Sequence, residues 1–152
     1  MINLRYTVFI FLGILLDQLL KFAAIRFLSF DKALIIIHNI FSLQLVYNFG
    51  AAYGILQNQR WLLTIIGFLV LCFCFIFQKK IADTFLSKLG LSFFVMGALG
   101  NWLDRLFRGY VVDFLDIKIF PILNLSDISI NIAILFFILG LFFDKQDEIK
   151  ST

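Results

Sequence analysis

Acidic and amide side chains gather beside two apolar segments of this 152-residue chain. Asp113 lies within Val-Val-Asp-Phe, and Asp127 follows Asn124 by three residues at the start of a long apolar run. A carboxylate among apolar neighbours needs either a partner or a raised pKa. Two aspartates that converge can share a proton, so that one acts as a base toward water and the other as an acid toward a leaving amine. Asp113 and Asp127 are therefore the first candidates for hydrolytic chemistry.

A second polar cluster closes another apolar run and contains Gly97, Asn101, Asp104 and Arg105. Their spacing places these residues on one face of a helix. Ionisable groups near hydrocarbon are costly, and they mark a transport pathway, a charge pair or a reaction. Because Asp113 follows this cluster closely and precedes the last apolar run, we expect all these polar side chains at one membrane face.

Several of these residues also have a purely structural interpretation. An acidic residue at position 127 caps a helix N-terminus and interacts favourably with the helix dipole, although Asn124 and Ser126 offer competing caps. Asp17 and Lys21 are four residues apart in the first apolar run. They form either an ion pair that stabilises the helix or a direct contact with substrate, and we favour the ion pair.

Composition indicates a lipid bilayer as the solvent. Hydrophobic residues make up 62% of the chain and charged residues 15%, and the mean hydropathy is +0.99. The 21 Phe and the single Pro fit long apolar helices, whose main-chain groups bond internally. The net charge of +3 comes from basic residues that are scattered singly or in the Lys79-Lys80 pair. Nucleic acid is excluded as a partner because no basic stripe exists for phosphates to follow.

No metal or organic cofactor is expected. Cys72 and Cys74 lie in an apolar run without a neighbouring ligand or disulfide partner, so we interpret them as packing residues. His38 is the one histidine and no G-x-S-x-G motif accompanies it, which disfavours a Ser-His or Cys-His peptidase. The absence of H-E-x-x-H likewise disfavours a metallopeptidase.

Hydropathy predicts an all-α polytopic membrane protein that forms a single domain over residues 1–152. The four expected transmembrane helices are at about residues 6–28, 61–77, 85–103 and 128–143. Two pairs of crossings place both termini on one side of the membrane. The basic residues of the connections and termini divide equally between the two sides of the membrane. The positive-inside rule therefore does not decide on which side the termini lie.

The connections between these helices predict a small sheet on the membrane surface. Residues 41–48 largely alternate apolar with polar side chains, which is typical of a strand, and Gly50 and Gly54 end it. The connection at residues 104–127 carries Val-Val-Asp-Phe and then Pro121. We expect extended chain there that ends in a turn.

Four runs resemble, in the same order, the signature blocks of the lipoprotein signal peptidase (signal peptidase II) family. They are Asp-Gln-Leu-Leu-Lys at 17–21, Asn-Phe-Gly-Ala-Ala-Tyr-Gly at 48–54, Gly-Ala-Leu-Gly-Asn-Trp-Leu-Asp-Arg at 97–105 with Gly-Tyr-Val-Val-Asp-Phe at 109–114, and Asn-Leu-Ser-Asp at 124–127. The third block is long and specific. Leu20, Tyr53, Met96 and Ser126 depart from the residues usual in the family, but none of them replaces a proposed catalytic group.

The resemblance implies a bacterial aspartyl endopeptidase that cleaves diacylglyceryl-modified prolipoproteins before the lipidated Cys, with Asp113 and Asp127 as the catalytic pair. It implies site-lining roles for Asn48, Asn101, Arg105 and Asn124, and supporting roles for Asp17, Lys21, Gly100 and Asp104. It also implies four spans in the cell inner membrane, cytoplasmic termini, and a surface sheet and active site on the extracytoplasmic side. The expected partners are lipid-modified precursors and membrane lipid, and we expect a monomer.

The main alternative is a small four-span proton-coupled transporter in which Asp17 pairs with Lys21 and relays protons. Such a transporter requires acidic residues at mid-membrane, whereas only Asp17 lies deep here and the other acids outside the tails concentrate at one interface. A structural scaffold for an envelope complex is a third interpretation, and it leaves the pattern of Asn and Asp residues unexplained. We rank both below the peptidase.

Overall fold

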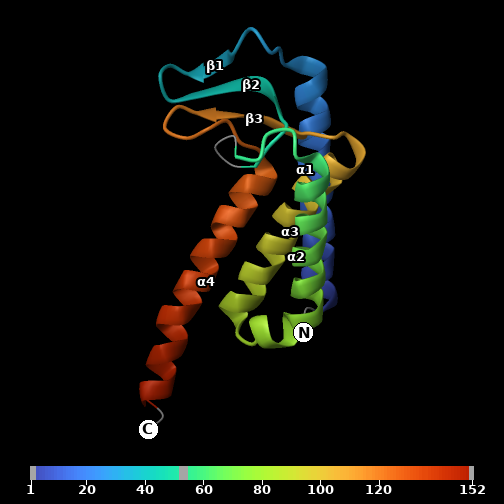
Figure 1. Ribbon diagram of the computed structural model, residues 1–152. Helices are drawn as coiled ribbons and strands as arrows, with labels where there is room; N and C mark the ends of the chain where they lie inside the picture. The colour runs from blue at the N-terminus through green and yellow to red at the C-terminus, as the bar shows by residue number, and fades with distance from the viewer. Residues whose placement is uncertain (1–2, 52–54, 151–152) are drawn as a thin grey trace.

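The computed structural model describes residues 3–51 and 55–150, and in them four helices carry a three-stranded antiparallel sheet at one end (Figure 1). The helices are α1 (Leu4–Phe27), α2 (Arg60–Ile81), α3 (Phe85–Phe107) and α4 (Leu125–Lys150). The strands are β1 (Leu34–Ile37), β2 (Phe41–Asn48) and β3 (Val111–Ile117). Tyr53 and Gly54, from the second signature block, lie outside the described residues.

Three of the described helices are long and apolar enough to cross a membrane, namely α1, α2 and the part Leu125–Phe143 of α4. Helix α3 is not among these three, and its buried residues include Ser92, Asn101 and Asp104. It packs against each of the other three helices. A helix that is surrounded by other helices can bury polar side chains against protein instead of exposing them to lipid.

Side-chain caps fix where α1 and α3 begin. The Asn3 side chain accepts hydrogen bonds from the main-chain N–H groups of Arg5 and Tyr6 at the start of α1. Thr84 and Ser87 form a reciprocal capping box at the start of α3. These caps satisfy N–H groups that have no partner inside the helix.

The sheet has the order β1-β2-β3, and its two faces have different roles. Leu45 on β2 and Val112 and Phe114 on β3 form a buried cluster with Ala24 of α1. Because side chains alternate along a strand, Asp113 points to the opposite face. The strand predicted at residues 41–48 and the extended chain predicted around 111–114 are confirmed as β2 and part of β3.

Helices α3 and α4 approach closely at two glycines. A Cβ atom on Gly97 would lie 2.3 Å from the main-chain oxygen of Ser126, and one on Gly100 would lie 2.0 Å from Ser126 Oγ and 2.7 Å from Asp17 Oδ2. Such distances are far below van der Waals contact. The absence of side chains at these positions therefore allows α1, α3 and α4 to meet near the sheet.

We predict that Gly97→Ala lowers the stability of the protein by about 1–3 kcal/mol, since the added methyl group has to push the α4 backbone away. Alanine is otherwise the better helix former by about 1 kcal/mol, so the loss would come from packing. Thermal unfolding in detergent is the measurement. Gly90→Ala is the matched control in the same helix, because its Cβ would meet only the Phe137 ring at 3.0 Å, and a ring can rotate away. An unchanged unfolding temperature for Gly97→Ala would contradict the close approach of the helices.

Candidate active site

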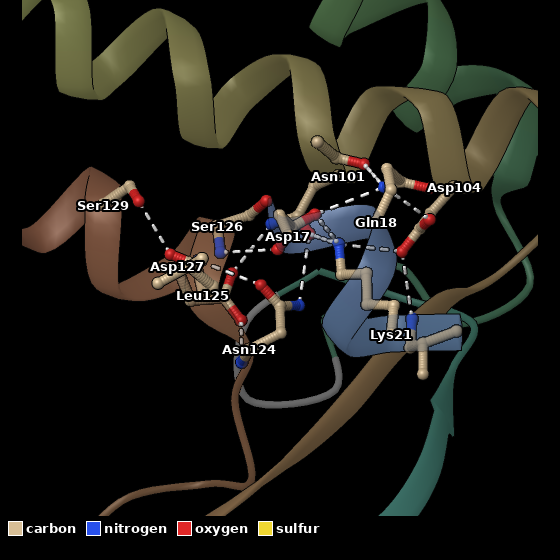
Figure 2. A network of polar contacts seen from close by, with 12 residues as sticks. Asp17, Gln18, Lys21, Asn101, Asp104, Asn124, Leu125, Ser126, Asp127 and Ser129 are labelled. Carbon is tan, nitrogen blue, oxygen red and sulfur yellow. Dashed lines mark hydrogen bonds and ion pairs between the residues drawn. The ribbon is translucent and has the colours of Figure 1, made fainter. Parts of the chain in front are cut away.

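The N-terminus of α4 holds the carboxyl group of Asp127. Asn124 Oδ1 accepts a hydrogen bond from Asp127 N at 3.0 Å, and Asp127 Oδ2 accepts one from Asn124 N at 3.1 Å. This reciprocal pair caps the helix. The other oxygen, Asp127 Oδ1, accepts a bond from Asn101 Nδ2 of α3 at 2.8 Å (Figure 2). Asp127 thus caps its helix and also presents a carboxyl group to α3.

Strand β3 carries the second carboxyl group, that of Asp113, which is 2% exposed. Asn124 Nδ2 donates to Asp113 Oδ1 at 2.6 Å, and Asn48 Nδ2 donates to Asp113 Oδ2 at 3.0 Å. Asn48 is the last residue of β2, and its own Oδ1 accepts a bond from Gly50 N. Because Asn124 bonds to both carboxyl groups, it brings Asp113 and Asp127 together at the junction of the sheet and α4.

The environment of Asp113 favours its protonated form. Burial raises the pKa of Asp113 to about 7, and the negative charge of Asp127 adds to the increase. Hydrogen bonds from Asn48 and Asn124 and the charge of Lys21 act in the opposite direction. Near neutral pH the pair can therefore retain one proton, which is the state that acid-base hydrolysis by two carboxyl groups requires.

A buried ammonium group lies behind this pair. Lys21 Nζ is 2.9 Å from Asp17 Oδ2, 2.9 Å from Asp104 Oδ2 and 3.1 Å from Asn101 Oδ1 (Figure 2). Lys21 is 0% exposed. The ammonium group can only donate, so the Asn101 amide must turn its oxygen toward Lys21 and its NH₂ group toward Asp127. The expected ion pair of Asp17 and Lys21 is present and also contacts α3.

The two carboxylates that bind Lys21 also hold the backbone beside each candidate catalytic residue. Asp17 Oδ1 accepts a bond from Ser126 N at 3.0 Å, and Ser126 directly precedes Asp127. Asp104 Oδ2 accepts a bond from Val112 N at 3.2 Å, and Val112 directly precedes Asp113. The ion-pair cluster therefore positions both main-chain segments that carry the aspartates.

A cavity of about 880 Å³ adjoins the pair and is lined by α2, α3, α4 and the sheet. Its polar lining includes Asn48, Asn101, Arg105, Asp113 and Asp127. Its apolar walls include Leu63, Gly67 and Val70 of α2 and Ile128 and Leu135 of α4. Asp17, Lys21, Gly100, Asp104 and Asn124 are not among the lining residues. Asn124 was expected to line the site, but it bonds to both aspartates from outside the cavity lining. The other four, Asp17, Lys21, Gly100 and Asp104, were expected in supporting positions.

Three arginines complete the surroundings: Arg105, which was expected to line the site, and Arg60 and Arg108, to which the sequence assigned no role. Arg60 donates to the main-chain oxygens of Arg105 and Leu106 at 2.8 and 2.7 Å and so satisfies the C-terminus of α3. Arg108 pairs with Asp104 and donates to Gln18 Oε1. Arg105 Nη2 donates to the main-chain oxygen of Gly50 at 3.0 Å. Among the described residues, no group of three or more His, Cys, Asp or Glu is arranged to hold a metal ion.

Residues 9–143 match the family model of signal peptidase (SPase) II. The chain belongs to the signal peptidase II family. It is similar to the lipoprotein signal peptidases of Halothermothrix orenii (38% identity, covering 90% of this chain and 92% of the relative) and Clostridioides difficile (35%, covering 94% and 99%). That of Streptococcus agalactiae serotype Ia is 37% identical, covering 88% of this chain and 89% of the relative.

Solved structures agree with this signal peptidase II assignment. Two bacterial membrane enzyme structures obtained by the in meso method, at 2.3 and 1.9 Å resolution, match with TM-scores of 0.87 and 0.82. They are 28% and 29% identical to this chain, and the matches cover 94% and 90% of it and 90% and 92% of those chains. The chain is therefore a bacterial membrane protein and an aspartic-type signal peptidase. The transporter alternative receives no support.

We predict that Lys21→Met destabilises this signal peptidase II by about 3–5 kcal/mol, because it leaves Asp17 and Asp104 buried without their cation. Cleavage should also fall, since the Asn101 amide loses the contact that fixes its orientation. The measurements are thermal unfolding in detergent and turnover below the unfolding temperature. Lys118→Met is the control: Lys118 pairs with Asp116, but its side chain is 46% exposed, so we expect a change of about 0–1 kcal/mol. Equal effects of the two substitutions would contradict a central role for Lys21.

Proposed function

We propose that this chain removes signal peptides from prolipoproteins by hydrolysing the peptide bond before a diacylglyceryl-modified Cys, with Asp113 and Asp127 as the catalytic pair. The observation that carries the proposal is the convergence of the two carboxyl groups on Asn124 at the polar end of an otherwise largely apolar cavity. Membership of the signal peptidase II family supports the substrate class.

The raised pKa of Asp113 suggests how the two carboxyl groups divide the reaction. Asp127 accepts a proton from water, whose oxygen attacks the scissile carbonyl carbon. Asp113 then gives its proton to the nitrogen as the C–N bond breaks. Arg105 lines the same cavity, and its fork of donors is suited to bind a substrate carbonyl oxygen.

The shape of the cavity is compatible with a membrane-spanning substrate. Helices α2 and α4 each pack on α3, and both contribute apolar residues to the cavity. We propose that the signal peptide enters between α2 and α4 from the lipid, and that the acyl chains of the modified Cys remain in the bilayer. Each buried acyl CH₂ contributes about 0.8 kcal/mol to holding the Cys at the membrane interface.

We also propose four spans in one domain, with α3 as the central span, and a monomer in the cell inner membrane. Helix α1 begins and α4 ends at the end of the bundle opposite the sheet (Figure 1). That arrangement is consistent with cytoplasmic termini and with an active site on the extracytoplasmic side. A signal peptide that crosses the membrane presents its lipidated Cys on the same side.

We predict that Asp113→Asn and Asp127→Asn each abolish cleavage of a lipidated precursor peptide, because an amide neither takes a proton from water nor gives one to the leaving nitrogen. Turnover by the purified variants in detergent is the measurement. Asp116→Asn is the matched control on the same strand, since Asp116 bonds to Ser42 and Lys118 and is not among the cavity-lining residues. It should retain activity. Near-normal turnover by either Asp113→Asn or Asp127→Asn would refute the assignment.

We predict a turnover that falls on both sides of an optimum, since the active pair holds a single proton. The Asp113 carboxyl, with a pKa of about 7, loses that proton as the pH rises, which produces the alkaline limb. Asn48 stabilises the ionised form of Asp113 by donating to it, so Asn48→Ala should raise this pKa and move the alkaline limb to higher pH. The measurement is the pH profile of turnover, with thermal unfolding followed in parallel. A limb that moves to lower pH in Asn48→Ala would contradict this role of Asp113.

A further inference from the structure

Asn131 is a polar residue in the membrane-spanning part of α4, one helical turn after Asp127, and it lines the cavity. Its Nδ2 donates to the main-chain oxygen of Asp127 at 2.9 Å. Its carbonyl oxygen Oδ1 has no hydrogen-bond partner among the residues that the structure describes. Asn131 is exposed on α4, and in a membrane span an exposed polar group without a partner is costly, so its presence there points to a function.

A substrate that is cleaved in this cavity needs hydrogen-bond acceptors for its main-chain N–H groups. The chain near the scissile bond has to be extended to reach two carboxyl groups, and its N–H groups then lose their helical partners. Water is scarce between apolar walls, so each freed N–H group requires an acceptor from the protein. On α4, the lining residues beyond Asp127 are Ile128, Ile130, Asn131, Ile132 and Leu135, and Asn131 is the polar one among them. The Trp102 indole, also in the lining, is a donor and is bonded to the Thr64 main-chain oxygen.

We infer that Asn131 Oδ1 accepts a hydrogen bond from a main-chain N–H group of the signal peptide, an inference that rests on the proposed function. Four residues along a helix correspond to about 6 Å, at 1.5 Å per residue. An extended chain advances about 3.3 Å per residue, so the same distance covers about two peptide residues. The bonded N–H group thus belongs to a residue about two positions before the scissile bond. Asn131 thus binds the main chain of the substrate. Its contribution does not depend on which side chain the signal peptide carries at that position.

The test is a series of lipidated peptides in which one main-chain amide at a time, over the last residues of the signal peptide, is replaced by an ester. The scissile amide stays unchanged. Wild-type enzyme should lose about three- to tenfold in kcat/KM at one ester position, the effect of one hydrogen bond. Asn131→Leu should show that same loss on the all-amide peptide and no further loss at that ester position. Asn131→Ala should behave in the same way, which separates polarity from side-chain size.

Ser129→Ala is the matched control. Ser129 Oγ donates to the main-chain oxygen of Leu125, four residues back, as Asn131 does to Asp127, but Ser129 is buried and is not among the cavity-lining residues. This variant should keep the wild-type sensitivity to the ester. The inference is overturned if, at every ester position, Asn131→Leu and the ester lower kcat/KM independently, so that the combined loss is the product of the two single losses. It is also overturned if Asn131→Leu keeps the wild-type kcat/KM on the all-amide peptide. Failure of wild-type enzyme to cleave the all-amide lipidated peptide would instead overturn the proposed function.

Discussion

The buried ammonium group of Lys21 is the interaction on which the rest of the site depends. A charge in the low-dielectric interior of a membrane protein is tolerated only with close partners, and Lys21 has three oxygen partners within 3.1 Å. Removing any of them would leave a charge or a donor buried without compensation. The cluster consequently fixes the distance between α1, which carries Lys21, and α3, which carries Asn101 and Asp104. Helix α1 does not line the cavity, yet it determines the geometry there.

The ion cluster depends on the close approach of the helices at Gly100. A Cβ atom on Gly100 would overlap Asp17 Oδ2 and Ser126 Oγ, so the bond from Asp17 to the α4 backbone exists only because residue 100 has no side chain. Through that bond, α1 holds the first turn of α4, and through Asp104 the same cluster holds β3 at Val112. The two aspartates come from different elements, and their relative position is set by carboxylates that have no part in the chemistry.

Local sequence patterns predicted much of this arrangement. The alternation at residues 41–48 corresponds to β2, and the spacing of Asp17 and Lys21 correctly predicted their ion pair. Strand β1 (Leu34–Ile37) was not predicted, because four consecutive apolar residues show no alternation, and all four are exposed. The contacts of Lys21 with α3 could not be predicted either, since they depend on how two helices pack. The sequence signal for Asn131 is a polar residue inside an apolar span.

The use of amides between Lys21 and the aspartates has a chemical consequence. An ammonium group in direct contact with a carboxyl group would favour its ionised form strongly and oppose the retention of a shared proton. Asn101 instead stands between them, with its oxygen on Lys21 and its NH₂ group on Asp127. Asn124 and Asn48 likewise supply neutral donors to Asp113. Contacts to a buried charge thus hold the site in place. Because the amide contacts are neutral, burial and the charge of Asp127 are the dominant influences on the pKa of Asp113. That pKa is therefore about 7, at which the carboxyl group can both hold a proton and donate it.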